Sequence, residues 1–171
     1  LAESVCVGCG QCIVACPVGA LSERSTIDEV WKAFADPTKK VVFFTAPSVR
    51  ATLGEAFDMP IGTNVEGKMV AAIRRLGQCE VFNMDVTADL TIMEEASELI
   101  NRIKTGKPMP MFTSCCPAWV KFVEQKYPEM IPNLSTCKSP QQMFGALLKT
   151  YWCEKHHIRP EDLFTVSVIP C

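Results

Sequence analysis

From about residue 40 onward, short apolar runs alternate with longer stretches in which apolar residues recur every three or four positions. A short apolar run is typical of a buried strand, whereas the longer period is typical of an amphipathic helix. Strands that alternate with helices indicate a parallel sheet flanked by helices. The pattern predicts strands at residues 41–45, 79–83, 110–113 and 164–169, and helices at residues 67–76, 89–105, 117–126 and 140–155.

Local signals place the ends of these helices. Pro117 and Pro140 stand near the first position of their helices, where the missing N–H of proline is not needed. The long helix has two possible N-caps, Asp89 or Thr91, the latter in a capping box with Glu94. Residues 27–40 are polar and contain a proline, so we expect a helix that runs into a linker.

Polar and thiol residues follow the end of each predicted strand. In open α/β sheets, ligands bind at the carboxyl ends of the strands. The pattern therefore predicts one large cofactor at that edge, reached by several strand-end loops. The segments concerned are Ala46-Pro47-Ser48, Met84-Asp85, Cys115-Cys116 and Pro170-Cys171.

The N-terminal segment carries a dense cysteine motif with the spacing C-x2-C-x2-C-x3-C-P, formed by Cys6, Cys9, Cys12 and Cys16. This is the run that holds [4Fe–4S] clusters in bacterial ferredoxins, in which the fourth cysteine ligates the other cluster. Three ligands of that second cluster are then expected upstream of the chain, so we expect a truncated N-terminus. Zinc is the rival metal, but zinc sites usually use two separated C-x2-C pairs.

Composition narrows the class of protein. The 171 residues include ten cysteines and are 48% hydrophobic and 21% charged, which favours a folded core over disorder. The net charge of −2 argues against a partner such as nucleic acid. No apolar run reaches the length of a membrane span. Because the cysteines are clustered, metal ligation is favoured over disulfides, and reduced thiols favour the cytoplasm.

The segment Thr113-Ser114-Cys115-Cys116-Pro117-Ala118-Trp119 resembles the first active-site motif, TSCCPxW, of the iron-only ([FeFe]) hydrogenases. Ile169-Pro170-Cys171 matches the last two residues of the Met-Pro-Cys triplet that opens the second motif. The resemblance implies an α/β fold in which a four-stranded, mostly parallel sheet is flanked by helices. It implies three parts: residues 1–26, the end of a ferredoxin-like 2×[4Fe–4S] domain; 27–40, a linker; and 41–171, the first lobe of the catalytic domain, cut at its C-terminus.

The cofactor implied by the resemblance is the H-cluster, a [4Fe–4S] cubane bridged to a di-iron subcluster with CO, cyanide and azadithiolate. Cys116 and Cys171 are then two cubane ligands, and the other two belong to a downstream motif. Cys115 matches the cysteine that passes protons to the dithiolate. The further residues implied are Glu95, Ser135 and Glu98 on the proton path, and Pro47, Ser48, Gln141 and Ile169 around the di-iron unit.

The implied activity is reversible proton reduction and hydrogen oxidation, with electrons relayed by ferredoxin-type clusters. Expected partners are H₂ and protons, ferredoxin or NAD(P)H-linked electron-transfer subunits, and H-cluster maturation proteins. The chain alone is expected to be inactive. Independently of the family, Glu95 and Glu98 share a helix face and can hand on a proton, although a solvated acidic face is the simpler interpretation.

One departure from the family pattern is Ile169, where the family usually has Met; Ile lacks the thioether. It favours, mildly, the alternative of a non-catalytic or slow H₂-sensing homologue. A cytosolic Fe–S assembly protein is a third hypothesis, but such relatives lose part of the double-cysteine motif, which is intact here. A plain ferredoxin would not explain the α/β part. Cys79, Cys137 and Cys153 match no motif, so we expect them to pack in the core.

Overall fold

The computed structural model describes residues 4–170, so Cys171 lies outside the described residues. The chain divides into two compact units. Of the described residues, the sheet unit comprises 26–89 and 140–170, and the cysteine unit comprises 4–25 and 90–139. The long helix α5 (Asp85–Thr105) begins in the sheet unit and continues into the cysteine unit.

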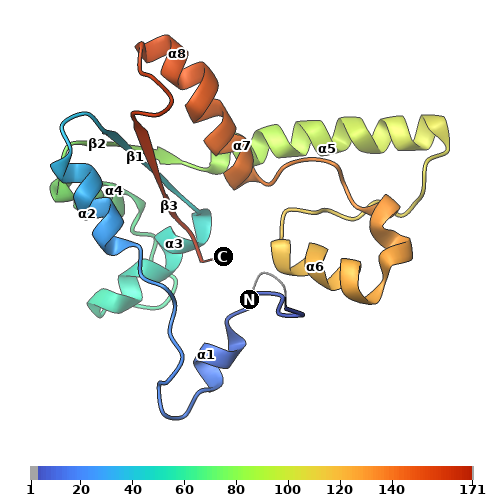
Figure 1. Ribbon diagram of the computed structural model, residues 1–171, viewed down its shortest axis with the longest axis horizontal. Helices are drawn as coiled ribbons and strands as arrows, with labels where there is room; N and C mark the ends of the chain where they lie inside the picture. Colours follow the sequence, from blue (N-terminus) through green and yellow to red (C-terminus); the bar gives the residue numbers. More distant parts are fainter. Residues whose placement is uncertain (1–3, 171) are drawn as a thin grey trace. The chain divides into compact units, whose positions relative to one another are not determined.

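The sheet unit is built on three parallel strands in the order β2-β1-β3 (Figure 1). They are β1 (Lys40–Thr45), β2 (Cys79–Asn83) and β3 (Leu163–Val168). Val41 of the central strand lies opposite Cys79 on one side and Phe164 on the other. Every residue of β1 after Lys40 is buried, as expected for a strand with both faces covered.

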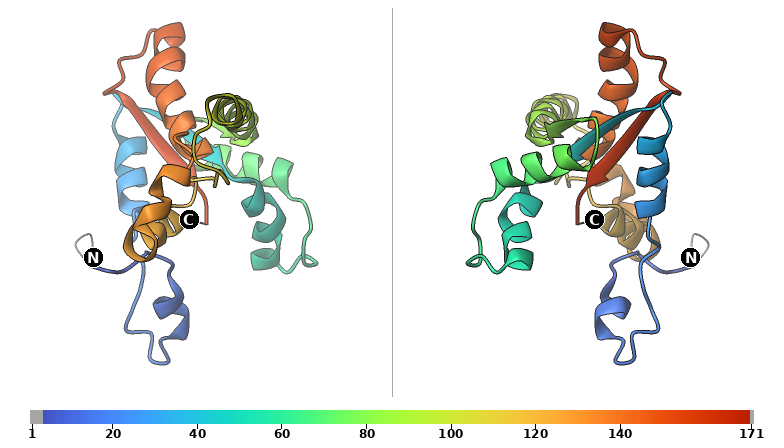
Figure 2. Two further views of the ribbon diagram at one scale, coloured as in Figure 1. Left: turned by 90° about the vertical axis from the view of Figure 1, so that its right-hand side faces the viewer. Right: turned by 90° about the vertical axis from the view of Figure 1, so that its left-hand side faces the viewer.

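Helices cover both faces of this sheet (Figure 2). Val42 and Phe44 face a cluster with Phe144 and Leu148, which belong to the helical segment of α7 (Pro140–Leu147), η3 (Leu148–Trp152) and α8 (Cys153–His156). Alternate residues of β1 point to opposite faces, and the other face packs on α2 (Ile27–Ala35) and α4 (Glu66–Leu76). The predicted α/β architecture is confirmed, and part of the polar segment 27–40 is the helix α2.

The predicted fourth strand, residues 110–113, is wrong. Within the described residues the sheet has three strands, and this segment forms only an isolated parallel bridge between Phe112 and Leu134. Phe112 donates its N–H to the Asn133 carbonyl at 2.8 Å, and its own carbonyl accepts from Ser135 N–H at 2.7 Å. Pro110 has no N–H to donate, so the segment cannot extend a ladder of hydrogen bonds.

Helix boundaries also differ from the prediction. α5 begins at Asp85, so both predicted N-caps, Asp89 and Thr91, lie inside the helix. Thr87 is fully buried in this first turn, so packing within the sheet unit offsets its weak helix propensity. The predicted helix 140–155 contains a π-helical turn at η3. Two short elements follow β1, namely α3 (Pro47–Thr52) and η1 (Leu53–Phe57).

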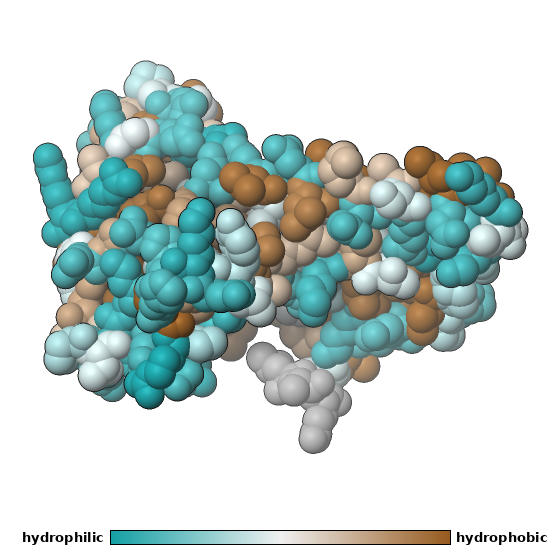
Figure 3. Space-filling model, turned by 90° about the horizontal axis from the view of Figure 1, so that it is seen from above, coloured by the Kyte–Doolittle hydropathy of each residue, from teal (hydrophilic) through white to brown (hydrophobic). Residues whose placement is uncertain are grey.

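The cysteine unit contains α1 (Gln11–Ala15), α6 (Pro117–Lys126) and η2 (Pro128–Asn133), besides most of α5. Apolar side chains lie at the surface along α5 (Figure 3). Ile92, Met93, Ile100 and Ile103 are each more than half exposed. Among residues 4–170, no helix is both long enough and apolar enough to cross a membrane.

Candidate metal and proton-transfer site

The N-terminal motif forms an open loop around a single turn of helix. Gly8 and Gly10 adopt φ angles of 72° and 75°, which L side chains rarely adopt, and α1 begins directly after Gly10. Cys6, Cys9 and Cys12 are exposed free thiols. The Gly8 N–H donates to Cys6 Sγ at 3.4 Å. The loop therefore presents thiols outward and can turn backbone N–H groups toward sulfur.

The thiol of Cys16 is close to several backbone N–H groups of the residues that follow it. The N–H groups of Val18 and Ala20 lower the pKa of its thiol from the ordinary value, and the Ala20 N–H lies 3.3 Å from Sγ. A lowered pKa favours the thiolate, the form that ligates iron. The donor set and its surroundings thus fit iron–sulfur clusters. Among residues 4–170, however, no three Cys, His, Asp or Glu side chains are gathered as a metal site.

Cys115 and Cys116 lie on the extended segment that leads into α6, and both are exposed. Cys116 is the N-cap of α6, with φ −93° and ψ 113°, and Pro117 takes the first helical position. The Cys116 carbonyl accepts the N–H of Val120 at 3.1 Å, so the helix fixes its backbone. Ser114 Oγ donates to the Ser135 carbonyl at 2.7 Å. The thiol pair is thereby tied to the segment that carries Ser135.

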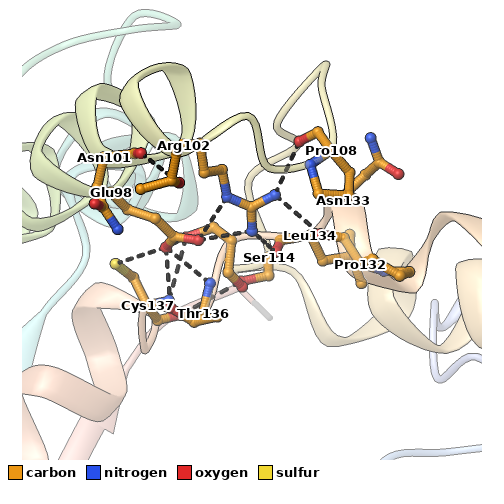
Figure 4. A network of polar contacts seen from close by, with 12 residues as sticks. Glu98, Asn101, Arg102, Pro108, Ser114, Pro132, Asn133, Leu134, Thr136 and Cys137 are labelled. Carbon is orange, nitrogen blue, oxygen red and sulfur yellow. Dashed lines mark hydrogen bonds and ion pairs between the residues drawn. The ribbon is translucent and has the colours of Figure 1, made fainter.

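Glu98 is the centre of a polar network in the cysteine unit (Figure 4). Its Oε1 accepts hydrogen bonds from Arg102 Nε at 2.9 Å and Nη2 at 2.7 Å. Its Oε2 accepts from Ser135 Oγ at 3.2 Å and from both the N–H and the hydroxyl of Thr136 at 3.0 Å. The Cys137 thiol lies 3.8 Å from the same oxygen. The structure therefore brings together two of the predicted proton-path residues, Glu98 and Ser135.

This network controls the charge of Glu98. Burial opposes ionisation, but hydrogen bonds from Arg102 and Thr136 outweigh it and lower the pKa of Glu98 from 4.5 to about 2. Cys137 shows the opposite effect: burial, aided by the negative charges of Glu98 and Glu95, raises the pKa of its thiol. At neutral pH the network therefore contains a carboxylate and a protonated thiol.

Arg102 is a member of the site that sequence reasoning missed. It is only 4% exposed, and besides Glu98 it donates to the carbonyls of Pro108 at 3.4 Å, Pro132 at 2.9 Å and Leu134 at 2.6 Å. Its spacing of four residues from Glu98 was the available signal, because residues at i and i+4 face each other on a helix. Arg102 joins α5 to two loops and supplies the positive charge that Glu98 needs.

Cys137 was predicted to be a core residue, and that prediction is wrong. Its side chain is half-buried and lines an open cavity of about 610 Å³, together with Glu94, Lys107 and the Glu98–Arg102 pair. Cys153 is 1% exposed in the core, as predicted, and Cys79 packs partly buried against the other cluster. The sequence pattern could not distinguish Cys137 from these two packing cysteines. Its contact with Glu98 joins residues that are far apart in the sequence.

The sheet unit places four predicted cofactor residues near the carboxyl ends of its strands. Pro47 and Ser48 are exposed in the first turn of α3, directly after β1. Gln141 Nε2 donates to Ser167 Oγ of β3 at 3.3 Å. Ile169 is partly buried and packs against the cluster that contains Phe44. Of the two remaining predicted residues, Glu95 belongs to the cysteine unit, where it is half-buried one turn before Glu98. The predicted ligand Cys171 lies outside the described residues.

Comparison with known families decides the class of protein. Residues 39–171 match the model described as iron only hydrogenase large subunit, C-terminal domain, and residues 2–22 match that of the 4Fe-4S binding domain. The chain belongs to the iron-only hydrogenase family. Its α/β fold with a three-stranded parallel sheet is that of the [FeFe]-hydrogenase structures, and its N-terminal cysteines lie in the segment that matches 4Fe-4S binding.

Individual relatives of this hydrogenase-family chain are close in sequence. It is 52% identical to the NADP-reducing hydrogenase subunit HndD of Solidesulfovibrio fructosivorans, over 100% of this chain and 30% of that protein. It is also 52% identical to iron hydrogenase 1 of Clostridium pasteurianum, over 91% of this chain and 27% of that protein. The chain thus spans less than a third of either relative.

A solved structure of a variant of [FeFe]-hydrogenase HydA1 from Chlamydomonas reinhardtii superposes with a TM-score of 0.81. The two are 42% identical, over 86% of this chain and 38% of that chain. A more distant relative is the cytosolic Fe-S cluster assembly factor NAR1 of Candida dubliniensis, 34% identical over 97% of this chain and 28% of that protein. The family thus includes both hydrogenases and assembly factors.

Proposed function

We propose that the chain forms part of the catalytic subunit of an [FeFe]-hydrogenase, which interconverts protons, electrons and hydrogen: 2H⁺ + 2e⁻ ⇌ H₂. The observation that carries this proposal is the pair of exposed, adjacent thiols Cys115 and Cys116 at the start of α6. A ligand must be a thiolate, whereas a proton carrier must exchange its proton. Two neighbouring thiols can divide these tasks.

The proposed cofactor is the H-cluster. When bound, its [4Fe–4S] cubane and its di-iron unit with CO, cyanide and azadithiolate supply the metal chemistry that joins protons and electrons. Cys116 and Cys171 hold the cubane in this proposal, with two further ligands that no other cysteine of the chain matches. The residues that border the di-iron unit are Pro47, Ser48, Gln141 and Ile169. Their place near the carboxyl ends of parallel strands supports this assignment.

The proposed electron route uses the ferredoxin-type motif. Cys6, Cys9 and Cys12 ligate one [4Fe–4S] cluster, and Cys16 ligates a second. The backbone donors around Cys16 support a thiolate there. The proposed redox partner is a ferredoxin or an NAD(P)H-linked subunit, and the match to a subunit printed as NADP-reducing supports the second class.

The proposed proton route runs from Cys115 through Glu95 and Ser135 to Glu98. The contact of Ser135 Oγ with Glu98 Oε2 at 3.2 Å supports its outer part. Because Glu98 is ionised at neutral pH, it acts as the acceptor of this pair, and the exchangeable proton is the hydroxyl proton of Ser135. The open cavity beside Glu98 supports exchange with solvent.

The test uses the complete gene product, matured in an anaerobic host together with the proteins that build the H-cluster. Infrared bands of bound CO and cyanide are expected, together with hydrogen evolution. Replacing Cys115 by Ala should lower turnover by at least about 100-fold, as expected for a lost acid–base group, while the bands remain. Cys79→Ala is the control and should leave both readouts unchanged. Absence of the bands in the wild-type protein would reject the H-cluster.

A hydrogen-sensing role is the second candidate, and Ile169 is the observation that favours it. Ile fills a volume similar to that of Met but offers no thioether to a neighbouring group. A sensor predicts intact CO and cyanide bands with slow turnover. Ile169→Met should then raise turnover, whereas unchanged turnover from an already fast wild-type protein would reject the sensor. The NAR1-type alternative predicts no CO or cyanide bands at all.

A further inference from the structure

A second polar network lies in the sheet unit, between the end of α3 and the starts of α4 and α5. Arg50, in the last turn of α3, places Nη1 2.8 Å from Asp85 Oδ2 and 3.6 Å from Glu66 Oε1. Asp85 is the first residue of α5 and Glu66 is the first residue of α4. Carboxylates are favourable at helix N-termini because of the positive end of the helix dipole. One guanidinium thus links α3 to the starts of two longer helices.

Asn83, the last residue of β2, completes the network. Its Nδ2 donates to Glu66 Oε1 at 2.9 Å and to Asp85 Oδ2 at 3.0 Å, and its Oδ1 accepts the Asp85 N–H at 3.1 Å. The amino group of Asn83 therefore bridges the two carboxylates, and its carbonyl oxygen holds the backbone at the start of α5. The contact with Asp85 raises the pKa of Arg50, which keeps the guanidinium charged throughout the accessible pH range.

The helix that Arg50 holds is too short to be stable by itself. α3 has six residues, whereas isolated helices shorter than about 12–15 residues are marginal in water. Its position depends on ties at both ends. At its start, Ala46 donates its N–H to the Val168 carbonyl at 3.0 Å; at its end, the Arg50 carbonyl accepts the Val65 N–H at 2.8 Å. The Arg50 side chain adds the link to β2 and α5.

We propose that Arg50, held by Asp85, Asn83 and Glu66, is a positioning residue that sets the orientation of α3 and thereby of Pro47 and Ser48. This inference rests on the proposed function, in which those two residues border the di-iron unit. Arg50 acts through the helix and not by contact with the reacting atoms. Both contacts with the carboxylates are made by Nη1, so a single charged nitrogen links Asp85 and Glu66.

The experiment compares Arg50→Met with wild type in the complete, matured gene product. Two readouts are used: hydrogen exchange of the amides of residues 48–52, and the positions and widths of the CO and cyanide infrared bands. Exchange in α3 should rise about tenfold, because a hydrogen bond to a charged group is worth about a factor of ten in a local opening equilibrium. The infrared bands should shift or broaden, and Arg50→Lys should restore part of both effects.

Arg159→Met is the matched control. Arg159 lies in the same unit and forms an ion pair with Asp162 at 2.7 Å, but it precedes β3 at the opposite, amino edge of the sheet. It should change neither readout. If Arg50→Met raises exchange equally throughout the sheet unit and leaves the infrared bands unchanged, the role of Arg50 is general stability and the inference is overturned. If the wild-type protein lacks the bands, the proposed function itself fails.

Discussion

Glu98 and Arg102, one helical turn apart on α5, form an ion pair of 2.7 Å in which the two side chains are only 15% and 4% exposed. Each partner has further polar contacts: Thr136 and Ser135 donate to the carboxylate, and three backbone carbonyls accept from the guanidinium. A buried charge pair of this kind is favourable only when its remaining hydrogen-bonding groups are satisfied. Here they are, and the pair can anchor the loops around it.

The first prediction concerns stability at low pH. The pKa of Glu98 is about 2 in the folded protein against 4.5 as its ordinary value, so between these values the unfolded state binds more protons. Stability from Glu98 is therefore fully present above about pH 4.5 and is lost as pH falls toward 2. The loss is up to about 3 kcal/mol. Urea denaturation at several pH values should reveal this slope, and Glu98→Gln should flatten it. An unchanged slope in that variant would assign the acid sensitivity to other carboxyl groups.

The second prediction concerns Arg102. Arg102→Met leaves the Glu98 carboxylate buried without its cation and removes the donors of three carbonyls. Breaking a buried pair in this way costs about 3–5 kcal/mol, whereas an exposed pair is worth about 0–1 kcal/mol. Arg159, which is 70% exposed in its pair with Asp162, provides the control variant Arg159→Met. Equal losses for the two variants in chemical denaturation would contradict the anchoring role of Arg102.

The sheet could be predicted because its evidence is local. Val41 to Phe44 form an apolar run, which is typical of a parallel strand that is buried on both faces. The segment 110–113 looked similar, but strand formation requires a partner in register and free N–H groups, and Pro110 lacks one. Nothing in the short run itself reports whether a neighbouring strand is available.

The same distinction between local and long-range evidence applies to the candidate site. Cys6 to Cys16 and the Cys115–Cys116 pair are contiguous motifs, so cysteine spacing predicted the first set and the TSCCPxW resemblance predicted the second. Arg102 and Cys137 enter the site through contacts with residues more than 30 positions away, at Leu134 and Glu98. Such contacts depend on how the loops pack, and the i, i+4 spacing of Glu98 and Arg102 indicates only that these two side chains face each other.

The third prediction concerns Gly77, which ends α4. Its φ of 169° is available to any residue, so conformational freedom is not the reason for glycine here. A Cβ at this position would lie 2.6 Å from Cδ1 of Phe34, whose ring stacks on Phe43 of the central strand. Gly77→Ala therefore forces the Phe34 ring to move, and overpacking of this kind costs about 1–3 kcal/mol.

Phe34→Leu provides the check for that prediction. A smaller side chain at position 34 leaves room for the new methyl group, so the cost of Gly77→Ala should fall when both changes are combined. A double-mutant cycle measured by thermal denaturation gives this coupling directly. Additive effects would mean that the ring contact is not the reason for glycine at this position.

The last prediction separates ligand cysteines from packing cysteines. Cys16 is surrounded by backbone donors that favour a thiolate, whereas Cys153 is 1% exposed in an apolar cluster with Phe44 and Leu163. In the complete gene product, Cys16→Ala should remove at least about one iron per molecule, because a [4Fe–4S] cluster needs four thiolates, and should alter the EPR spectrum of the reduced protein. Cys153→Ala should keep the full iron content and lower stability by about 1 kcal/mol through the small cavity it leaves.

Iron analysis and EPR of the two variants, prepared in parallel under anaerobic conditions, test this prediction. Full iron content in Cys16→Ala would contradict its assignment as a ligand, and loss of iron only in Cys153→Ala would reverse the two roles.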